Sequence, residues 1–327
     1  MHVRQAAFYR RHLRKGSPMA FERARAHAVA KPWGVSDLRP FSNTFGGEDD
    51  KIGEIWYERE DAAAYASSLL LKLLFTSEPL SIQVHPDDTF ARGIGLENGK
   101  TEAWYVLSAA PEAKLALGLK KHLNPQQLRA AIDDGSIADL VVWRPVCVGD
   151  SFFVPAGSIH AIGAGLVIAE IQQRSDATFR LFDYGRRREL HAADAVAVAI
   201  TEPADFKFKQ ICLTPERTQV VSCPYFSMER FDLPPNSSWR LKADGETWIL
   251  GVSGEALAGL FSIAPGEAAF VKSASFDFRV GAAGLISLVA YTGAGPLPDL
   301  LMRIGHDGDF DYAPRNAAAI QVAGIVQ

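Results

Sequence analysis

The chain is poor in cysteine, has no long apolar run and carries little net charge, and each of these absences argues against a class of protein. Among its 327 residues the cysteines are Cys147, Cys212 and Cys223. Because their number is odd and they lie far apart, we expect free thiols in a reducing compartment rather than a disulfide framework. No Cys-x-x-Cys pair is present, which argues against a thiolate zinc site.

The longest apolar runs, such as Ala161 to Ala169, have the length of a strand and are too short to cross a bilayer as a helix. The net charge of −4 gives no reason to expect nucleic acid, because phosphate backbones bind basic surfaces. We therefore expect a cytoplasmic protein with neither nucleic acid nor membrane as a partner.

The N-terminal segment is basic. The first 31 residues carry eight lysines or arginines and a single acid, Glu22. No apolar stretch follows them, so they do not form a secretory signal. We interpret residues 1–18 as a flexible tail and Met19 as the start of the core protein.

Up to about residue 200, short segments rich in Val, Ile, Leu and aromatic residues are separated by Gly, Pro, Asp and Asn. Such segments, bounded by turn-forming residues, are typical of β-strands. We expect strands at Ser68–Phe75, Leu80–Val84, Ala103–Leu107, Lys114–Leu119, Ser151–Val154 and Leu166–Gln172. Many short strands at close spacing favour an all-β barrel or sandwich.

One segment within this region predicts a helix. Asn124 suits the N-cap, Pro125 the first helical position and Gly135 the stop. We also expect short helices around Ser136–Val142 and His191–Ile200.

From about residue 205 the pattern returns to strands, which include Thr247–Val252, Ala268–Val271, Phe276–Val280 and Leu285–Tyr291. This half is interpreted as a second, smaller β-unit. The predicted organisation is a tail over residues 1–18, a first domain over 19–204 with a helical insertion at about 122–142, and a C-terminal β domain over 205–327.

Two segments place polar side chains together on one face of a strand. Because side chains two apart share a face, Gln83 and His85 point the same way. The same period places Lys100, Glu102 and Trp104 together. Amide oxygen, imidazole and carboxylate can all bind a metal. A solvent-facing histidine and a surface ion pair are the ordinary alternatives for these two segments.

Two further segments carry candidate functional residues. His160 follows an aromatic strand and a Pro-Ala-Gly turn, which predicts a place at the rim of a barrel, where ligand sites form. Arg180 stands between two apolar residues, an unusual place for a charge unless it faces a polar cavity. The run Arg186, Arg187 and Arg188 is interpreted as a solvated cluster.

In this order, four segments together resemble the signature blocks of type I mannose-6-phosphate isomerases. They are Gln83-Val84-His85-Pro86, Gly99-Lys100-Thr101-Glu102-Ala103-Trp104-Tyr105, Pro155-Ala156-Gly157-Ser158-Ile159-His160-Ala161 and Ser175-Asp176-Ala177-Thr178-Phe179-Arg180-Leu181-Phe182-Asp183-Tyr184. The segments Lys31-Pro32-Trp33-Gly34 and Ile52-Gly53-Glu54-Ile55-Trp56 resemble N-terminal blocks of the same family. The resemblance covers roughly residues 31–186, and past residue 205 it is only architectural.

The resemblance implies a mainly β fold: a cupin-type double-stranded β-helix barrel with a small helical insertion and a second C-terminal β-unit. It implies that the first domain binds one Zn²⁺ per chain through Gln83, His85, Glu102 and His160. It also implies that Arg180 and Lys100 are catalytic. The activity it implies is the interconversion of mannose 6-phosphate and fructose 6-phosphate through an enediol intermediate, by a monomer or a homodimer.

Several points stay open at this level. The base that moves the proton is Lys100, a metal-bound water or a carboxylate. The phosphate site is not placed by the sequence, and basic residues near the rim, including Lys100 and Arg186, are candidates for it. A cupin dioxygenase can hold Fe(II) with two histidines and a carboxylate, but it has no evident use for Gln83 and Lys100. A sugar- or metal-binding cupin without turnover is the second alternative.

Overall fold

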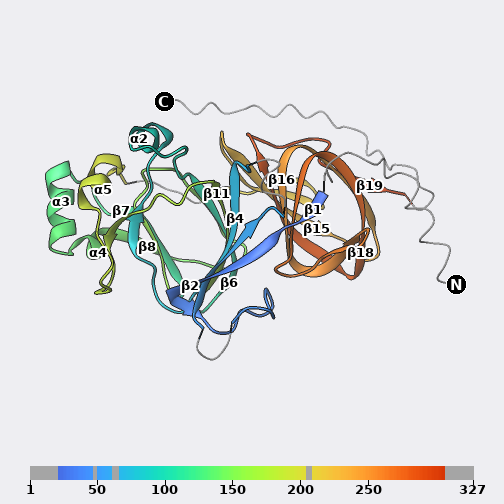
Figure 1. Ribbon diagram of the computed structural model, residues 1–327, viewed down its shortest axis with the longest axis horizontal. Coiled ribbons are helices and arrows are strands. Elements are labelled where there is room, and N and C mark those ends of the chain that lie inside the picture. Colours follow the sequence, from blue (N-terminus) through green and yellow to red (C-terminus); the bar gives the residue numbers. More distant parts are fainter. Residues whose placement is uncertain (1–20, 47–49, 61–65, 204–207, 306–327) are drawn as a thin grey trace.

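The computed structural model describes residues 21–46, 50–60, 66–203 and 208–305. They form two β-rich lobes that lie side by side, with the helices gathered on the first lobe (Figure 1). The tail expected over residues 1–18, and Met19 after it, lie outside the described residues. Within the described ranges, none of the helices has the length and apolar character needed to span a membrane.

The first lobe is built from two sheets. The six-stranded sheet has the order β2 (Arg25–Val35), β3 (Ile52–Glu58), β4 (Leu69–Thr76), β11 (Leu166–Gln173), β6 (Glu102–Ala109) and β9 (Ser151–Val154). The five-stranded sheet has the order β12 (Phe179–Phe182), β5 (Ile82–Val84), β10 (His160–Ile162), β7 (Lys114–Leu119) and β8 (Val141–Pro145). One buried cluster draws side chains from both sheets, including Leu74, Val106, Leu117 and Ile168, so the two sheets pack face to face.

Strand β4 is buried along its whole length because it lies between two cores. Leu69, Leu71 and Leu73 pack in a cluster shared with the second lobe. The alternate side chains, among them Lys72 and Leu74, point into the first lobe, since successive side chains of a strand face opposite sides. A lysine is thereby placed inside a barrel.

The four helices of the described residues are α2 (Asp88–Gly93), α3 (Pro125–Asp133), α4 (Ile137–Leu140) and α5 (Ala192–Val198). Helix α3 confirms the prediction: Asn124 and Gln127 form a capping box, and Gly135 follows the helix with a φ of 79°. The helices expected around Ser136–Val142 and His191–Ile200 are confirmed as α4 and α5. Helix α2 was not predicted, because it has six residues and is too short to show apolar periodicity.

The second lobe is an eight-stranded sheet. Its main path is β13 (Ile211–Thr214), β14 (Arg217–Ser222), β15 (Phe226–Leu233), β18 (Ala268–Thr292), β16 (Ser238–Ala258) and β17 (Phe261–Ile263), with β1 (Phe21–Arg23) on β18 and β19 (Leu301–Ile304) on β16. The prediction of three separate strands between 268 and 291 was wrong, because they form the single strand β18. The strand bends at Ser273 and Gly284, both with positive φ, and its pairing continues with β1, β16 and β15 in turn. All three cysteines are free, as predicted.

Glu246, on β16 of the second lobe, binds the start of β4 in the first. Its carboxylate accepts hydrogen bonds from the backbone amides of Ser68 and Leu69, at 2.7 and 3.0 Å. It also accepts one from Trp248 Nε1 at 3.0 Å. Because Glu246 is buried, water cannot take the place of its carboxylate as the acceptor of these three hydrogen bonds.

We therefore expect Glu246→Ala to lower the free energy of unfolding by about 2–4 kcal/mol, the usual result of leaving buried donors unpaired. Urea unfolding followed by circular dichroism measures the change. The exposed Glu255, on the same strand, serves as the control, and Glu255→Ala should change stability by less than about 0.5 kcal/mol. Equal stabilities for the two variants would contradict this role of Glu246.

Candidate metal centre

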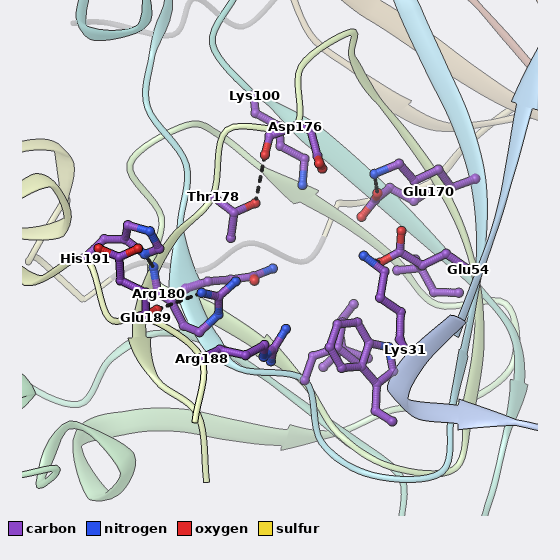
Figure 2. A pocket seen from close by; sticks show the side chains of 16 residues that line it. Lys31, Glu54, Lys100, Glu170, Asp176, Thr178, Arg180, Arg188, Glu189 and His191 are labelled. Carbon is purple, nitrogen blue, oxygen red and sulfur yellow. Dashed lines mark hydrogen bonds and ion pairs between the residues drawn. The ribbon is translucent and has the colours of Figure 1, made fainter. Parts of the chain in front are cut away.

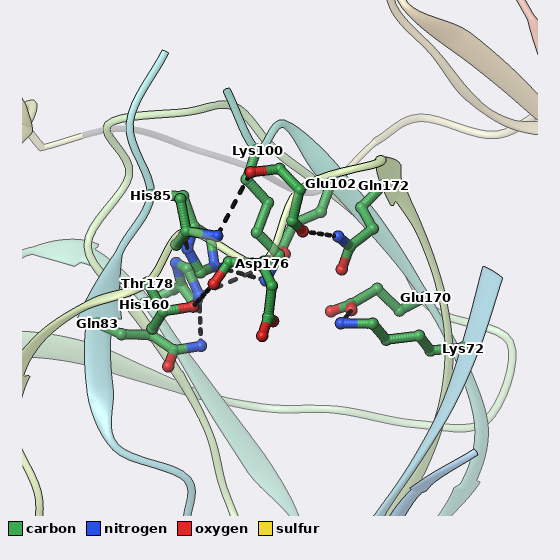
Figure 3. Close-up of polar contacts among 12 residues, drawn as sticks. Lys72, Gln83, His85, Lys100, Glu102, His160, Glu170, Gln172, Asp176 and Thr178 are labelled. Carbon is green, nitrogen blue, oxygen red and sulfur yellow. Dashed lines mark hydrogen bonds and ion pairs between the residues drawn. The ribbon is translucent and has the colours of Figure 1, made fainter. Parts of the chain in front are cut away.

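Three strands bring the predicted ligands together. Gln83 lies on β5 and pairs directly with His160, the first residue of β10. His85 directly follows the last residue of β5. Glu102 opens β6 in the facing sheet and points into the same interior (Figure 3). The four predicted ligands therefore meet, although they come from segments far apart in the sequence.

The three strongest ligands lie within metal-binding distance of one another. One ligand atom from each of His85, Glu102 and His160 fits within a span of 4.8 Å. Glu102 Oε2 is 3.4 Å from His85 Nε2, and Glu102 Oε1 is 3.4 Å from His160 Nε2. All three side chains are buried, with at most 2% of their surface exposed.

Both imidazoles are held in the form that binds metals. His85 Nδ1 lies 2.8 Å from the Ala177 carbonyl and His160 Nδ1 lies 2.9 Å from the Ser158 carbonyl. A carbonyl only accepts, so each Nδ1 carries the proton and each Nε2 presents a lone pair. Burial, followed by the charge of Lys100, lowers the pKa of His85 to about 3. Burial also lowers the pKa of His160, so both rings are neutral at pH 7.

Glu102 has the opposite tendency. Burial opposes its ionisation, but the charge of Lys100 and, after it, the contact with His85 hold its pKa well below the usual range. Neither of its oxygens has a hydrogen-bond partner among the described residues, although Lys100 Nζ forms an ion pair with Oε2 at 3.0 Å. A carboxylate facing two imidazole lone pairs is a site for a cation. These residues therefore fit a divalent metal ion.

Gln83 and Lys100 complete the immediate surroundings. Gln83 Nε2 lies 3.2 Å from His160 Nε2, and Lys100 Nζ lies 3.1 Å from His85 Nε2. Burial opposes the charge of Lys100, but the carboxylates of Glu102 and Glu170 outweigh this effect and raise its pKa. The lysine is thus a fixed cation beside the site.

A cavity of about 350 Å³ opens beside this centre, and Gln83, Lys100 and Arg180 line it (Figure 2). Arg180 pairs with Gln83 across β12 and β5, which confirms that this arginine faces a polar cavity. A hollow of this size with convergent charged groups is typical of a site for a small molecule.

Comparison with known proteins shows which protein family the chain resembles in sequence. Over 219 residues the chain is 31% identical to the probable mannose-6-phosphate isomerase GmuF of Bacillus subtilis, a match that covers 61% of this chain and 67% of that protein. The chain belongs to the mannose-6-phosphate isomerase family. It is also 39% identical over 194 residues to the mannose-6-phosphate isomerase of Streptococcus mutans, covering 56% of this chain and 61% of the relative. No model of a known protein family matches the chain.

The fold agrees with membership of the mannose-6-phosphate isomerase family. The crystal structure of the mannose 6-phosphate isomerase of Bacillus subtilis superposes with a TM-score of 0.72, at 24% identity, over 82% of this chain and 98% of that one. The mainly β, cupin-type fold with a small helical insertion and a C-terminal β-unit is thereby confirmed.

Sequence reasoning gave no role to two residues on the wall of the cavity, Lys72 and Glu170. Lys72 and Trp104 both pair with Glu170 in the six-stranded sheet. Lys72 Nζ lies 3.6 Å from Glu170, and Trp104 Nε1 donates to it at 3.0 Å. Burial, and then the charge of Glu102, raises the pKa of Glu170. The signal in the sequence was an ionisable residue in the middle of each of two otherwise apolar strands.

A second ion pair between a lysine and a glutamate lies farther along the wall. Glu54 and Lys31 both line the cavity, and Lys31 Nζ is 3.1 Å from Glu54 Oε1. Glu54 also accepts a hydrogen bond from Trp56 Nε1 at 2.5 Å. Burial opposes its ionisation, but the charges of Lys72 and Lys31 lower its pKa.

The arginine run is not the solvated cluster that was expected. Arg187 is exposed, but the side chains of Arg186 and Arg188 are only 16% and 30% exposed, and both bind the buried Asp183. Arg188 lines the cavity, whereas Arg186 reaches the Pro79 carbonyl behind it. The prediction failed because sequence periodicity does not show that Arg186 and Arg188 form ion pairs with the buried Asp183.

The segment before Glu102 is tightly positioned. Asp88 accepts from the backbone amide of Gly99 at 2.8 Å and from Gln173 Nε2 at 2.9 Å. Gln173 in turn accepts from the Thr101 amide at 3.0 Å. A Cβ at position 99 would lie 2.5 Å from the backbone of Asp87, so only glycine lets this segment approach. Lys100 is fixed by these contacts.

Proposed function

We propose that the chain is a metal-dependent aldose–ketose isomerase that interconverts mannose 6-phosphate and fructose 6-phosphate. The observation that carries the proposal is the convergence of His85, Glu102 and His160 beside a cavity that Gln83, Lys100 and Arg180 line. The names of the relatives support this choice of substrate.

We propose zinc as the ion, one per chain, held by Gln83, His85, Glu102 and His160. Two neutral imidazoles, a carboxylate and an amide oxygen suit a borderline divalent cation. When bound, it supplies Lewis-acid polarisation of a sugar oxygen. Gln83 now directs Nε2 toward His160, while its Oε1 lies 3.2 Å from Ser81 Oγ. A half-turn of the amide exchanges the two atoms.

The chain's own residues can carry the rest of the reaction. Isomerisation moves a proton between adjacent carbons through an enediol, so it needs a proton carrier and stabilisation of charge on oxygen. We propose Glu170 as the carrier, because it lines the cavity and its raised pKa suits proton exchange. Lys100 and Arg180 are cations on the same cavity and would stabilise the oxygen charge.

The direct test is turnover of mannose 6-phosphate to fructose 6-phosphate by the zinc-loaded protein in a coupled assay. Activity that disappears with a chelator and returns with zinc supports the proposal. Binding of the sugar phosphate without turnover would favour the non-catalytic sugar-binding cupin. Oxygen uptake with substrate after loading with Fe(II) would favour the cupin dioxygenase.

Arg180→Ala tests the proposed role of the arginine. It should keep its metal, because Arg180 is not among the ligands, and lose about 100-fold or more in kcat, the usual cost of removing a donor to a developing oxyanion. Metal analysis beside the coupled assay measures both. Arg129, exposed on α3, gives the control Arg129→Ala, which should match the wild type. Loss of metal from Arg180→Ala would contradict the assignment.

The remaining expectations also stand as proposals. We propose a metal-binding unit over residues 19–204 and a C-terminal β domain over 205–327. Strand β1 pairs with β18, so the first described residues of the chain contribute to the C-terminal sheet. We further propose a cytoplasmic protein that acts as a monomer or a homodimer.

A further inference from the structure

The two sides of the cavity differ in how their charges are balanced. On one side each lysine has a carboxylate of its own: Lys31 with Glu54 at 3.1 Å, and Lys72 with Glu170 at 3.6 Å. Figure 2 shows Arg180 and Arg188 together on the other side. The acids near these arginines are the buried Asp183 and the exposed Glu78 and Glu189.

Asp183 is the buried acid on the arginine side, and it serves two guanidinium groups, Arg186 and Arg188. Arg180 donates through Nη1 to the Glu189 carbonyl at 2.7 Å, and its Nε is buried without an acceptor among the described residues. The carboxylate of Glu189 belongs to an exposed residue. The buried carboxylate of Asp183 is thus paired with two of the three arginines, and the other nearby acids, Glu78 and Glu189, are exposed to solvent, which screens their charge. The arginines therefore keep positive charge at the edge of the cavity.

The remaining acid of the lining, Asp176, does not correct this imbalance. Its charge acts on Lys100, beside the metal centre. Burial lowers the pKa of Arg180, and the nearby charge of Arg188 lowers it further. An anion placed beside these two arginines would relieve their repulsion.

Arg188 is held in position to bind such an anion. Its Nε and Nη2 donate to Asp183 at 2.8 and 2.5 Å, and its guanidinium carbon lies 4.9 Å from the centre of the Trp33 ring. A guanidinium stacked on an aromatic ring and paired on one edge keeps a fixed plane. Its third nitrogen, Nη1, makes no hydrogen bond within the described residues, and the side chain lines the cavity.

We propose that Arg188, stacked on Trp33 and oriented by Asp183, binds the phosphate group of the substrate through Nη1. Arg180, which pairs with Gln83, would then lie between the phosphate and the metal centre. This inference rests on the proposed function, since it names the part of the cavity that distinguishes a sugar phosphate from a free sugar. Arg186, one of the candidates that the sequence offered for the phosphate site, binds Glu78 and the Pro79 carbonyl instead.

The test compares Arg188→Gln with Arg187→Gln in the full chain. The two variants remove the same charge from adjacent positions, and Arg187 is exposed. Binding of inorganic phosphate is measured by isothermal titration calorimetry, and KM and kcat for mannose 6-phosphate are measured with zinc-loaded protein. Thermal melts check that each variant is folded.

Arg188→Gln should weaken phosphate binding and raise KM by about 10- to 100-fold, as expected when a hydrogen bond between charged groups is lost. Its kcat should stay within about threefold of the wild type, since only interactions specific to the transition state change kcat. Arg187→Gln should match the wild type. If Arg188→Gln does not fold, Arg188→Lys is used instead. It keeps the positive charge but lacks the planar guanidinium group, and it should bind phosphate more weakly than the wild type.

Wild-type phosphate affinity and KM in the Arg188 variants would overturn the proposal, as would a fall in kcat with unchanged KM. The titration needs no turnover, so the two proposals can fail separately. A wild-type protein that binds phosphate through Arg188 but does not isomerise sugar phosphates would refute only the proposed function. If the protein is an active isomerase and its phosphate affinity does not change when Arg188 is replaced, only the proposal that Arg188 binds phosphate is refuted.

Discussion

Glu102→Ala should purify without its metal and lose at least about 1,000-fold in turnover, because the one carboxylate among the proposed ligands is removed and metal-dependent chemistry goes with it. In the structure this carboxylate lies 3.4 Å from each histidine Nε2, and neither of its oxygens has a hydrogen-bond partner among the described residues. Elemental analysis of the purified variant and a coupled isomerase assay measure the two losses together.

Two further variants make this result interpretable. Glu102→Ala leaves the buried Lys100 without the partner 3.0 Å away, which by itself lowers stability. Glu102→Gln keeps the side-chain volume and removes the charge, so this variant should fold. Its metal affinity should nevertheless be lower than that of the wild type by a factor of at least about ten. Glu97→Ala, at an exposed glutamate nearby, is the control. Full metal content and full activity in Glu102→Ala would end the proposed scheme.

Glu170→Gln should keep its metal and lose about 100- to 10,000-fold in kcat, the usual contribution of a positioned acid–base group. The amide fills the same space between Lys72 and Trp104 but cannot take up a proton. Exchange of the substrate proton at C2 with deuterium from solvent should be lost in parallel, a result that a merely structural role would not produce. Mass spectrometry or NMR follows the exchange.

Glu54→Gln is the matched comparison for this prediction. Glu54 lines the same cavity and also pairs with a lysine, but nearby charges lower its pKa rather than raise it. We expect it to lose much less kcat than Glu170→Gln and to keep proton exchange. Equal losses in the two variants, or exchange that continues in Glu170→Gln, would remove Glu170 from the role of proton carrier.

Local patterns in the sequence were sufficient for much of the fold. The capping residues at Asn124 and Gly135 predicted α3, and apolar runs between turn formers predicted strands such as β7 and β11. These features depend on neighbours in the chain, so propensity and periodicity report them. The strand β18 was divided wrongly, because its continuity comes from partners far away in the sequence.

Part of the candidate site could likewise be predicted from local sequence patterns, and part of it could not. Side-chain alternation put Gln83 beside His85 and Lys100 beside Glu102, and the contacts of these residues agree. The meeting of the two pairs with His160 required the register between β5 and β10 and the packing of two sheets. Glu170 and Lys72 were overlooked because their pairing is a cross-strand contact with no local pattern.

The sequence by itself determined the strand-rich character of the chain, the helical insertion and the pairs of polar residues that share one face of a strand, because these follow from the local periods of two and 3.6 residues. Only the tertiary structure decided which charges share the cavity and which partners satisfy them. Arg186 and Arg188 differ by two positions in the sequence, yet one reaches a backbone carbonyl behind the cavity and the other lines it. The direction of each side chain depends on a buried carboxylate and an aromatic ring brought there by the fold.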